Sequence, residues 1–309
     1  MSENDAPLLE RLWIYQRERF PLFKTSVLLL VFTAASVTVS ATLARRAPPG
    51  FATYLVAWVS TFILFFQLRA SDEVKDFEDD SRFRPERPIP RGLVSLRTIV
   101  SLALALGVVA ALLVFNLKAA MLLTLVLVWA WLALMSVEFF VPTYLRARPF
   151  LYLVSHMAIM PLIDLFVTSL EWLPYGAPPP GLWWFLGLSF ANGCVLEIGR
   201  KVWAPECERP GVETYSSLIG ATRAALLWVM ALFAAFALLL GVGFAVATPL
   251  LVATIGALAL ALVAAFGLAF ACAPSVKGQG RIEAGAGLWV FVCYGAGGFA
   301  PYLAKAIGA

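Results

Sequence analysis

Long apolar blocks dominate the pattern of hydrophobic and polar positions along the chain. A helix needs about 20 mainly apolar residues to cross the hydrocarbon core of a bilayer. Nine stretches satisfy this length, and they are residues 22–43, 51–69, 93–115, 118–136, 150–170, 181–199, 217–242, 244–272 and 284–307. The pattern therefore predicts an all-α integral membrane bundle of nine transmembrane helices, with residues 1–309 forming a single domain.

The first 21 residues differ from the spans because charged and apolar residues alternate in them. Glu10, Arg11, Arg17, Glu18 and Arg19 stand among apolar residues, and no short apolar region is followed by a small-residue cleavage site. This composition is not that of a signal peptide. An amphipathic helix that lies at the membrane interface is expected over residues 1–21.

Basic residues are unevenly distributed between the two sides of the predicted bundle. The chain is 61% hydrophobic and 14% charged, and its net charge is +4. Lys and Arg concentrate in the N-terminal segment and after the even-numbered spans, which predicts that these parts lie in the cytoplasm. We expect a multi-pass protein of the cell (inner) membrane with a cytoplasmic N-terminus and cytoplasmic polar loops. Its positive charge follows from topology, and no nucleic-acid binding is indicated.

The two loops that are richest in mixed charge follow the second and the sixth span. They are four spans apart and on the same predicted side of the membrane. This arrangement suggests a weak internal repeat that brings both polar loops over one cavity.

The most informative polar segment, Asp72-Glu-Val-Lys-Asp-Phe-Glu-Asp-Asp80, directly follows the second span. On a helix, Asp72, Asp76 and Asp80 recur at i, i+4 and i+8 and share one face. Like charges at this spacing repel by roughly 0.2–0.5 kcal/mol per pair, so a cation is expected among them. Mg²⁺ prefers oxygen ligands and often reaches phosphates through one or two carboxylates. The segment predicts a metal–diphosphate site, and the alternative is a solvated charged loop.

This segment resembles the first motif of the UbiA superfamily of intramembrane prenyltransferases, which reads N-D-x-x-D-x-x-x-D and then R-P-x-x-x-G. The chain has Asp72-Glu73-x-x-Asp76-x-x-x-Asp80 and then Arg87-Pro-Ile-Pro-Arg-Gly92, with a spacing similar to the chlorophyll synthase-like branch. The nine-helix plan of that family also fits the span count. The resemblance implies catalytic, metal-binding roles for Asp72, Asp76 and Asp80, with Glu73 as a further ligand. Asp72 replaces the family's Asn and Glu73 its Asp, and both keep oxygen ligands.

A weaker second motif follows the sixth span. Gly211-x-x-Thr214 and then Gly220 match the spacing after the family's second acidic motif, but Cys207 stands where the family usually has its last Asp. Glu206 and Glu208, which flank it, are the predicted substitute metal ligands. The alternative is that these glutamates are loop charges paired with nearby basic residues.

The resemblance implies that basic residues near the two motifs bind the diphosphate, because cations stabilise the charge on a departing diphosphate. The predicted diphosphate ligands are Arg87, Arg146, Arg148, Arg200 and Lys201. Topology alone also explains basic residues on this side of the membrane.

Polar residues inside or beside the apolar spans complete the set of candidates. Ionisable groups in a membrane are costly and usually face a cavity or one another. His156, Asp164, Asn192 and Glu197 are therefore assigned to the acceptor or channel, with interhelical hydrogen bonds as the alternative. The single histidine and the four scattered cysteines provide no His-based or CxxC metal site.

Together with the resemblance, these features predict Mg²⁺-dependent transfer of a prenyl group from a prenyl diphosphate to a lipophilic acceptor, typically an aromatic ring, within the bilayer. The same family also implies a terpene cyclase or a polyprenyl-phosphate glycosyl or phosphoribosyl transferase as alternatives. A transporter or permease is less favoured because the acidic cluster lies at a helix end and not near the midplane. An inactive lipid-binding scaffold is a further alternative. The sequence leaves the oligomeric state unassigned.

Overall fold

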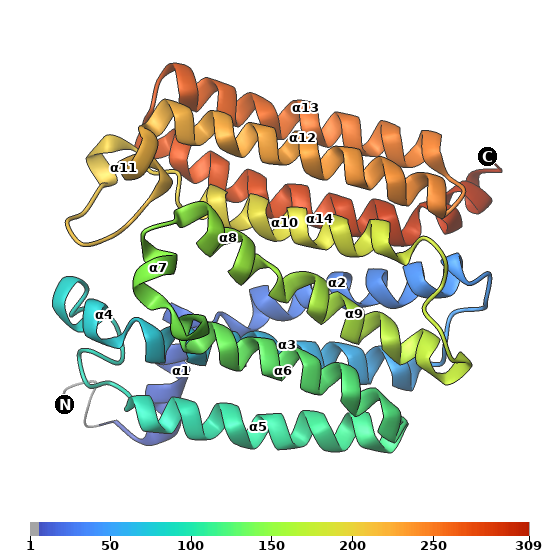
Figure 1. Ribbon diagram of the computed structural model, residues 1–309, viewed down its shortest axis with the longest axis horizontal. Coiled ribbons are helices and arrows are strands. Elements are labelled where there is room, and N and C mark those ends of the chain that lie inside the picture. Colours follow the sequence, from blue (N-terminus) through green and yellow to red (C-terminus); the bar gives the residue numbers. More distant parts are fainter. Residues whose placement is uncertain (1–5, 309) are drawn as a thin grey trace.

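Helices form all the regular structure in residues 6–308, which are the residues described by the computed structural model (Figure 1). The α-helices, in chain order, are α1 (Leu8–Arg19), α2 (Leu22–Leu43), α3 (Phe51–Lys75), α4 (Phe77–Phe83), α5 (Leu96–Leu117), α6 (Leu122–Ser136), α7 (Pro142–Arg146), α8 (Pro149–Met157), α9 (Ile159–Trp172), α10 (Leu182–Arg200), α11 (Tyr215–Ile219), α12 (Ala221–Ala245), α13 (Pro249–Cys272) and α14 (Val276–Ile307). The short 3-10 helices are η2 (Ala119–Met121), η3 (Glu138–Phe140), η4 (Leu173–Tyr175) and η5 (Pro205–Cys207).

Nine segments within residues 6–308 are long and apolar enough to cross a membrane, which confirms the predicted number of spans. The fourth span joins η2 to α6, and the fifth joins α8, α9 and η4. Each of the others is one helix. The prediction of an all-α, multi-pass membrane protein is therefore confirmed.

The spans close into a ring of neighbouring helices. In order around the ring, α2 packs on α3, then α6, α9, α10, α12, α13 and α14 follow, and α14 returns to α2. Helix α5 lies outside this ring against α3 (Figure 1). Because the second and sixth spans, α3 and α10, both belong to the ring, the ends of these two helices border the same interior.

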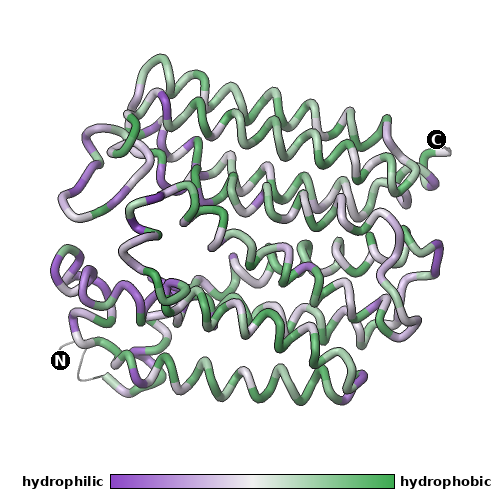
Figure 2. Tube along the Cα trace, viewed as in Figure 1, coloured by the Kyte–Doolittle hydropathy of each residue, from purple (hydrophilic) through white to green (hydrophobic). Residues whose placement is uncertain are grey.

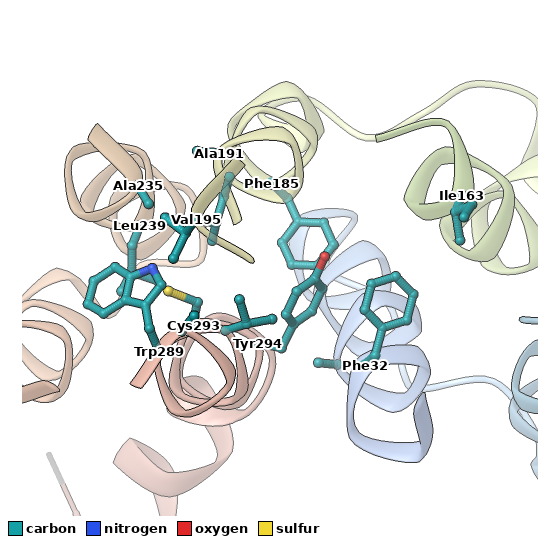
Figure 3. Close-up of a cluster of buried hydrophobic side chains, with 14 of the residues drawn as sticks. Phe32, Ile163, Phe185, Ala191, Val195, Ala235, Leu239, Trp289, Cys293 and Tyr294 are labelled. Carbon is teal, nitrogen blue, oxygen red and sulfur yellow. The ribbon is translucent and has the colours of Figure 1, made fainter. Parts of the chain in front are cut away.

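Small residues allow α14 to approach α2 closely. A Cβ added at Gly298 would lie 2.7 Å from the Cβ of Ala35, and packing of this kind holds helices together in lipid. Nearby, Phe32 and Phe185 flank Tyr294 (Figure 3), and the ring centroids of Phe32 and Tyr294 are 4.6 Å apart. These side chains fill the space between α2, α10 and α14.

Two predicted spans have different boundaries because of local chemistry. The second span extends past its predicted end at residue 69 to Lys75, so part of the acidic segment continues α3. The fifth span is not one helix, because it breaks at Ala158. Pro161 explains the break, since proline has no N–H to donate to the carbonyl of Met157.

The last span begins at Val276 and not at the predicted residue 284. Ser275 is its N-cap and accepts a hydrogen bond from the Gly278 N–H at 3.2 Å, which satisfies one of the free donors at the helix start. Lys277 and Arg281, predicted to lie in the preceding loop, are therefore in the first turns of α14.

The N-terminal helix α1 is anchored to the bundle by its own small core. Tyr15 is 2% exposed, and Phe20 packs edge-on against Phe62 and Phe66 of α3. Leu9 and Trp13 point outward and are 81% and 58% exposed. A helix is thus confirmed in the predicted amphipathic segment 1–21, of which residues 1–5 lie outside the described residues, and its position at the membrane interface stays a prediction.

Polar residues gather at one end of the bundle. Figure 2 shows hydrophilic segments at the end that carries α1, α4 and the connection from α10 to α11. The long transmembrane helices between the two ends are mainly apolar in the same view. This polar end holds both of the loops that the sequence singles out.

Candidate metal and diphosphate site

The acidic segment keeps its helical spacing across a break in the helix. Helix α3 ends at Lys75, Asp76 has φ −89° and ψ 3°, and α4 begins at Phe77. The Asp76 N–H still donates to the Asp72 carbonyl at 2.9 Å, and the Asp80 N–H donates to the Asp76 carbonyl at 2.7 Å. The three aspartates therefore occupy successive turns, as their spacing predicts.

Asp80 differs from the other two aspartates because arginines already neutralise it. Its carboxylate is 4% exposed and forms ion pairs with Arg84, at 3.1 Å, and with Arg87. The role of Asp80 as a metal ligand stays a prediction. In this conformation its carboxylate holds the Arg-Pro segment (Arg87–Gly92) against α4.

Asp72 and Asp76 form the more open half of the acidic segment. Asp72 is 42% exposed, with only Arg69 at 3.5 Å as an ion-pair partner, and no residue within 6–308 forms an ion pair with Asp76. Burial raises the pKa of the Asp76 carboxyl above its ordinary value, and the negative charge of Asp72 raises it further. An added cation would relieve this repulsion.

The donors present fit Mg²⁺ when a diphosphate supplies the remaining oxygens. Within residues 6–308, no three His, Cys, Asp or Glu side chains are grouped to hold a metal ion. Mg²⁺ sites commonly use only one or two carboxylates together with substrate phosphates and water. Asp72 and Asp76 provide two such carboxylates at adjacent turns.

Glu73 faces the N-terminal helix. Its carboxylate accepts a hydrogen bond from Arg19 Nε at 2.6 Å, and its side chain is 3% exposed. Its predicted role as a metal ligand is untested and would require this ion pair to open. The contact shows a second use for the acidic segment, which is to anchor α1 beside the site.

The second motif forms a turn and a helix cap. The Thr214 hydroxyl accepts a hydrogen bond from the Ser217 N–H at 2.9 Å and donates to Glu208 at 2.7 Å. Gly211 and Gly220 have φ of 78° and 88°, a region that glycine adopts without strain. Glu206 is exposed on η5. The structure thus gives Thr214 and the two glycines local folding roles, and the metal roles of Glu206 and Glu208 stay predictions.

The two polar loops meet over the same end of the bundle, as the sequence predicts. Arg209 and Glu86 form an ion pair at 3.8 Å between them. A Cβ at Gly211 would lie 2.5 Å from the Phe83 ring, so the second loop packs directly on α4. The acidic segment and the second motif therefore lie against each other at the polar end of the bundle, and we call this part of the protein the mouth.

The predicted diphosphate ligands occupy different places. Arg200 and Lys201 pair with Glu197 at 2.5 and 3.0 Å, three and four residues along the chain. Arg200 is 56% exposed, and its charge also interacts with Asp72 and Asp76. Arg200 is thus an exposed basic residue close enough to the open aspartates for its charge to act on theirs.

The three other arginines of the predicted set have different surroundings. Arg87 is held by Asp80. Arg146 and Arg148 are exposed near the α7–α8 connection, and the Arg148 guanidinium lies 3.7 Å from the centroid of the Tyr144 ring. Contact with a diphosphate stays a prediction for all three arginines.

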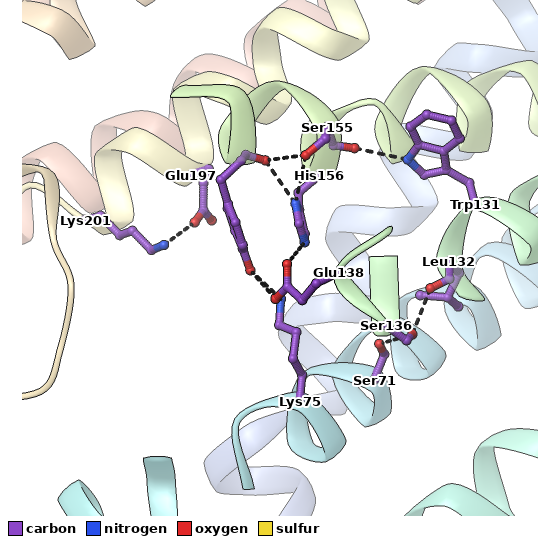
Figure 4. Close-up of polar contacts among 11 residues, drawn as sticks. Ser71, Lys75, Trp131, Leu132, Ser136, Glu138, Ser155, His156, Glu197 and Lys201 are labelled. Atoms are coloured by element: carbon purple, nitrogen blue, oxygen red, sulfur yellow. Dashed lines mark hydrogen bonds and ion pairs between the residues drawn. The ribbon is translucent and has the colours of Figure 1, made fainter. Parts of the chain in front are cut away.

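A buried polar cluster beside this mouth was missed by the sequence reasoning. Glu138 is 6% exposed and lies 3.4 Å from Lys75, 3.3 Å from the Tyr152 hydroxyl and 3.6 Å from His156 (Figure 4). Lys75 donates a hydrogen bond to the Tyr152 hydroxyl. The Lys201 ammonium lies 5.8 Å from the centroid of the Tyr152 ring. The cluster therefore joins α3, η3 and α8, and it lies near the end of α10.

The backbone that carries Glu138 is strained. Glu138, Phe139 and Phe140 have φ of 50°, 52° and 61°, whereas L-residues other than glycine adopt this left-handed region at a cost of roughly 1–2 kcal/mol each. Strain of this kind concentrates at functional sites. The one sequence signal was an acidic residue at the end of an apolar span.

The comparisons with known proteins identify the family of the chain. The UbiA prenyltransferase family matches residues 29–279. The chain belongs to this family. No curated protein sequence matches the chain.

Solved structures show that the UbiA family fold extends over nearly the whole chain. One match is the structure of a digeranylgeranylglyceryl phosphate synthase. The match spans 93% of this chain and 97% of that protein, with a TM-score of 0.62 and 13% sequence identity. A UbiA homologue from Aeropyrum pernix K1 covers 88%, is covered over 98% of its length, and has a TM-score of 0.64 and 18% identity. These identities establish a shared fold. Family membership supports a membrane prenyltransferase that acts on prenyl substrates in lipid.

Two further predicted residues of this UbiA family member lie deep between the helices. Asp164 accepts hydrogen bonds from Ser36 at 2.6 Å and from Tyr294 at 2.5 Å. His156, predicted to share its face, belongs instead to the Glu138 cluster, because the break at Ala158 separates the two. Asp164 therefore makes interhelical hydrogen bonds, which were the alternative to its predicted role at the acceptor or channel.

Asn192 lies on α10 beside a narrow apolar pocket. The pocket is lined by residues of α2, α3, α9, α10 and α14, among them Phe32, Phe65 and Met160. The Asn192 side chain is buried beside the weakly polar Cys293 thiol, and neither its Nδ2 nor its Oδ1 has a hydrogen-bond partner within residues 6–308. A buried amide without a full set of partners is costly, so this residue is well suited to meet a ligand in the pocket.

Proposed function

We propose that the protein transfers a prenyl group from a prenyl diphosphate to a lipophilic acceptor, and that Mg²⁺ is required. The observation that carries the proposal is the open pair Asp72 and Asp76, which lies beside the exposed Arg200 at the polar end of an apolar bundle. A prenyl diphosphate has this same polarity, with an anionic head and an apolar tail. The head would bind at the mouth and the tail between the helices.

Asp72 and Asp76 would hold the metal ion, whose charge stabilises a leaving diphosphate when it is bound. Arg200 has N–H donors beyond those used by Glu197, so it can also bind phosphate oxygens. Lys201 is fixed by the same glutamate at 3.0 Å. These residues orient the diphosphate and stabilise the negative charge that develops on it as the bond between the prenyl carbon and oxygen breaks.

The narrow pocket beside Asn192 is suited to an isoprenoid tail. Leu29, Phe32 and Phe65 contribute apolar and aromatic surface there. We favour an aromatic acceptor because this is the usual acceptor implied by the family resemblance.

We place the mouth on the cytoplasmic side of the cell (inner) membrane. Support comes from the basic residues of the N-terminal segment and of the connections at the polar end, which fit the positive-inside rule. Prenyl diphosphates that are made in the cytoplasm would then reach the site directly.

The direct test is to incubate the purified protein in lipid nanodiscs with labelled prenyl diphosphates of several lengths. The expected result is Mg²⁺-dependent release of diphosphate with formation of a prenylated acceptor, and EDTA should abolish it. A cyclised product formed from the prenyl diphosphate alone would favour the cyclase alternative. Transfer of a sugar phosphate to a polyprenyl phosphate would favour the glycosyl or phosphoribosyl alternative. Ion flux into proteoliposomes without product would instead identify a transporter.

A further inference from the structure

The Glu138 cluster offers a chemical function that the metal and diphosphate site does not supply. The inference rests on the proposed transfer reaction, in which an acceptor loses a proton as it gains a prenyl group. We propose that Tyr152, Glu138 and His156 form a relay that accepts this proton. Tyr152 is the member that meets the acceptor, and Glu138 and His156 hold the proton behind it.

Hydrogen bonding fixes the orientation of the His156 ring. Nδ1 lies 2.9 Å from the backbone carbonyl of Tyr152. A carbonyl oxygen can only accept, so Nδ1 carries the hydrogen. The other ring nitrogen of the neutral side chain, Nε2, therefore presents a lone pair.

That lone pair faces a second acceptor. His156 Nε2 lies 3.6 Å from Glu138 Oε2, and both atoms are buried without a hydrogen-bond partner within residues 6–308. The two side chains are 4% and 6% exposed. Two buried acceptors that face each other lack a hydrogen bond, and one added proton would join them. The pair is thus built to receive a single proton.

Tyr152 connects the buried pair to the mouth. Lys75 donates to the Tyr152 hydroxyl, which leaves that hydroxyl free to donate to Glu138 Oε1 at 3.3 Å. Tyr152 is half-buried, its ring stacks on His156 with centroids 3.8 Å apart, and the charge of Asp76 interacts with it. The hydroxyl therefore lies between the reaction site and the pair.

The charged groups around the relay act on a protonated His156 in opposite directions. The carboxylates of Glu138 and Glu197 favour its positive charge, and the ammonium of Lys75 opposes it. Lys75 and Glu138 act on His156 from α3 and η3, and Glu197 acts on it from α10. Lys75 lies 3.4 Å from Glu138, so it can stabilise a transient negative charge on Tyr152. The strained turn at residues 138–140 places the Glu138 carboxylate against Tyr152 and His156.

The proposed step balances as follows. The bond between prenyl C1 and the diphosphate oxygen breaks, and its electron pair leaves with diphosphate. An electron pair of the acceptor forms the new bond to C1, and the acceptor proton passes to the Tyr152 oxygen. The original Tyr152 proton moves to Glu138 Oε1, and rotation of the carboxyl group then presents it to His156 Nε2. The proton later returns to solvent.

The test uses Tyr152→Phe, Glu138→Gln and His156→Asn in the full-length protein. Asn can keep the hydrogen bond to the Tyr152 carbonyl while it removes Nε2. We expect the rate of transfer to fall by about 10²–10⁴-fold, the size of a general-base contribution, and the acidic limb of the pH–rate profile to flatten. Mg²⁺-dependent binding of a non-hydrolysable prenyl thiolodiphosphate should keep its wild-type affinity.

Glu171→Gln is the matched control, because it neutralises another buried carboxylate, the partner of Arg46 at 2.7 Å. It should leave the pH profile unchanged. Wild-type transfer rates and pH profiles in all three relay variants would overturn the inference, as would an equal loss of analogue binding and transfer. If Glu138→Gln fails to fold, Tyr152→Phe decides the matter alone. Wild-type protein that never binds the analogue with Mg²⁺ would instead refute the proposed function, and the relay with it.

Discussion

The guanidinium of Arg87 binds the carboxylate of Asp80, although the sequence assigns these residues to a diphosphate and a metal ion. Arg84 binds the other carboxylate oxygen at 3.1 Å. The first motif is therefore divided into a closed part around Asp80 and an open part at Asp72 and Asp76. The two parts should respond differently to substitution.

Asp80→Asn should destabilise the protein. It leaves two partly buried arginines without their counter-charge, and breaking a buried ion pair costs about 3–5 kcal/mol. Asp72→Asn, at a side chain that is 42% exposed, should change stability by less than about 0.5 kcal/mol. Thermal unfolding of both variants in detergent measures the difference. Equal losses of stability would contradict the division of the motif.

Asp72→Ala and Asp76→Asn should weaken Mg²⁺-dependent prenyl diphosphate turnover by at least about 100-fold, the scale of losing one group that stabilises developing charge. Asp79→Asn is a matched control, because this aspartate is exposed and lies outside the predicted ligand set. Turnover and Mg²⁺ titrations of the three variants provide the measurement. Full activity in Asp76→Asn would refute the metal assignment.

Gly211→Ala should separate the two polar loops. A Cβ there meets the Phe83 ring and also forces a non-glycine residue to φ 78°, a conformation that costs roughly 1–3 kcal/mol. Gly220→Ala is the control, because its φ of 88° also lies in the region that favours glycine, but no atom lies within 4 Å of the added group. Activity should fall further in Gly211→Ala, and Phe83→Ala should recover part of that excess. Equal behaviour of the two glycine variants would show that the Phe83 contact is unimportant.

Acidification should release the N-terminal helix from the Arg-Pro segment. The hydrogen bond from Arg91 is the main cause that lowers the pKa of Glu18, and its 2.8 Å contact joins α1 to that segment. A carboxyl whose pKa is lowered on folding contributes stability above its unfolded pKa and loses it as pH falls through the folded value. The wild type should exceed Glu18→Gln in stability near neutral pH by about 0.2–1 kcal/mol, as for an exposed pair.

This advantage should vanish at a pH below the folded pKa of Glu18. Unfolding temperatures of the two proteins across the acidic range test it. A difference that stays constant with pH would show that the ion pair does not anchor α1.

The sequence was sufficient for the spans and for the spacing of Asp72, Asp76 and Asp80, because both depend on local periodicity. It missed the break at Ala158, although Pro161 was its visible cause. The role of Glu138 could not be predicted from the sequence, for a different reason. Its importance depends on Tyr152 and His156, which α8 brings back to it, and on a left-handed backbone turn that no residue type there announces.

Helix α10 carries both ends of the proposed substrate site. Asn192 and Arg200 stand on this one unbroken helix, and at 1.5 Å per residue they are about 12 Å apart along its axis. A tail whose head is held at Arg200 must therefore pass Asn192 at a fixed depth. The distance along α10 thus fixes which part of the prenyl chain reaches Asn192. The chain length that the protein prefers should then depend on how far the apolar pocket continues beyond Asn192.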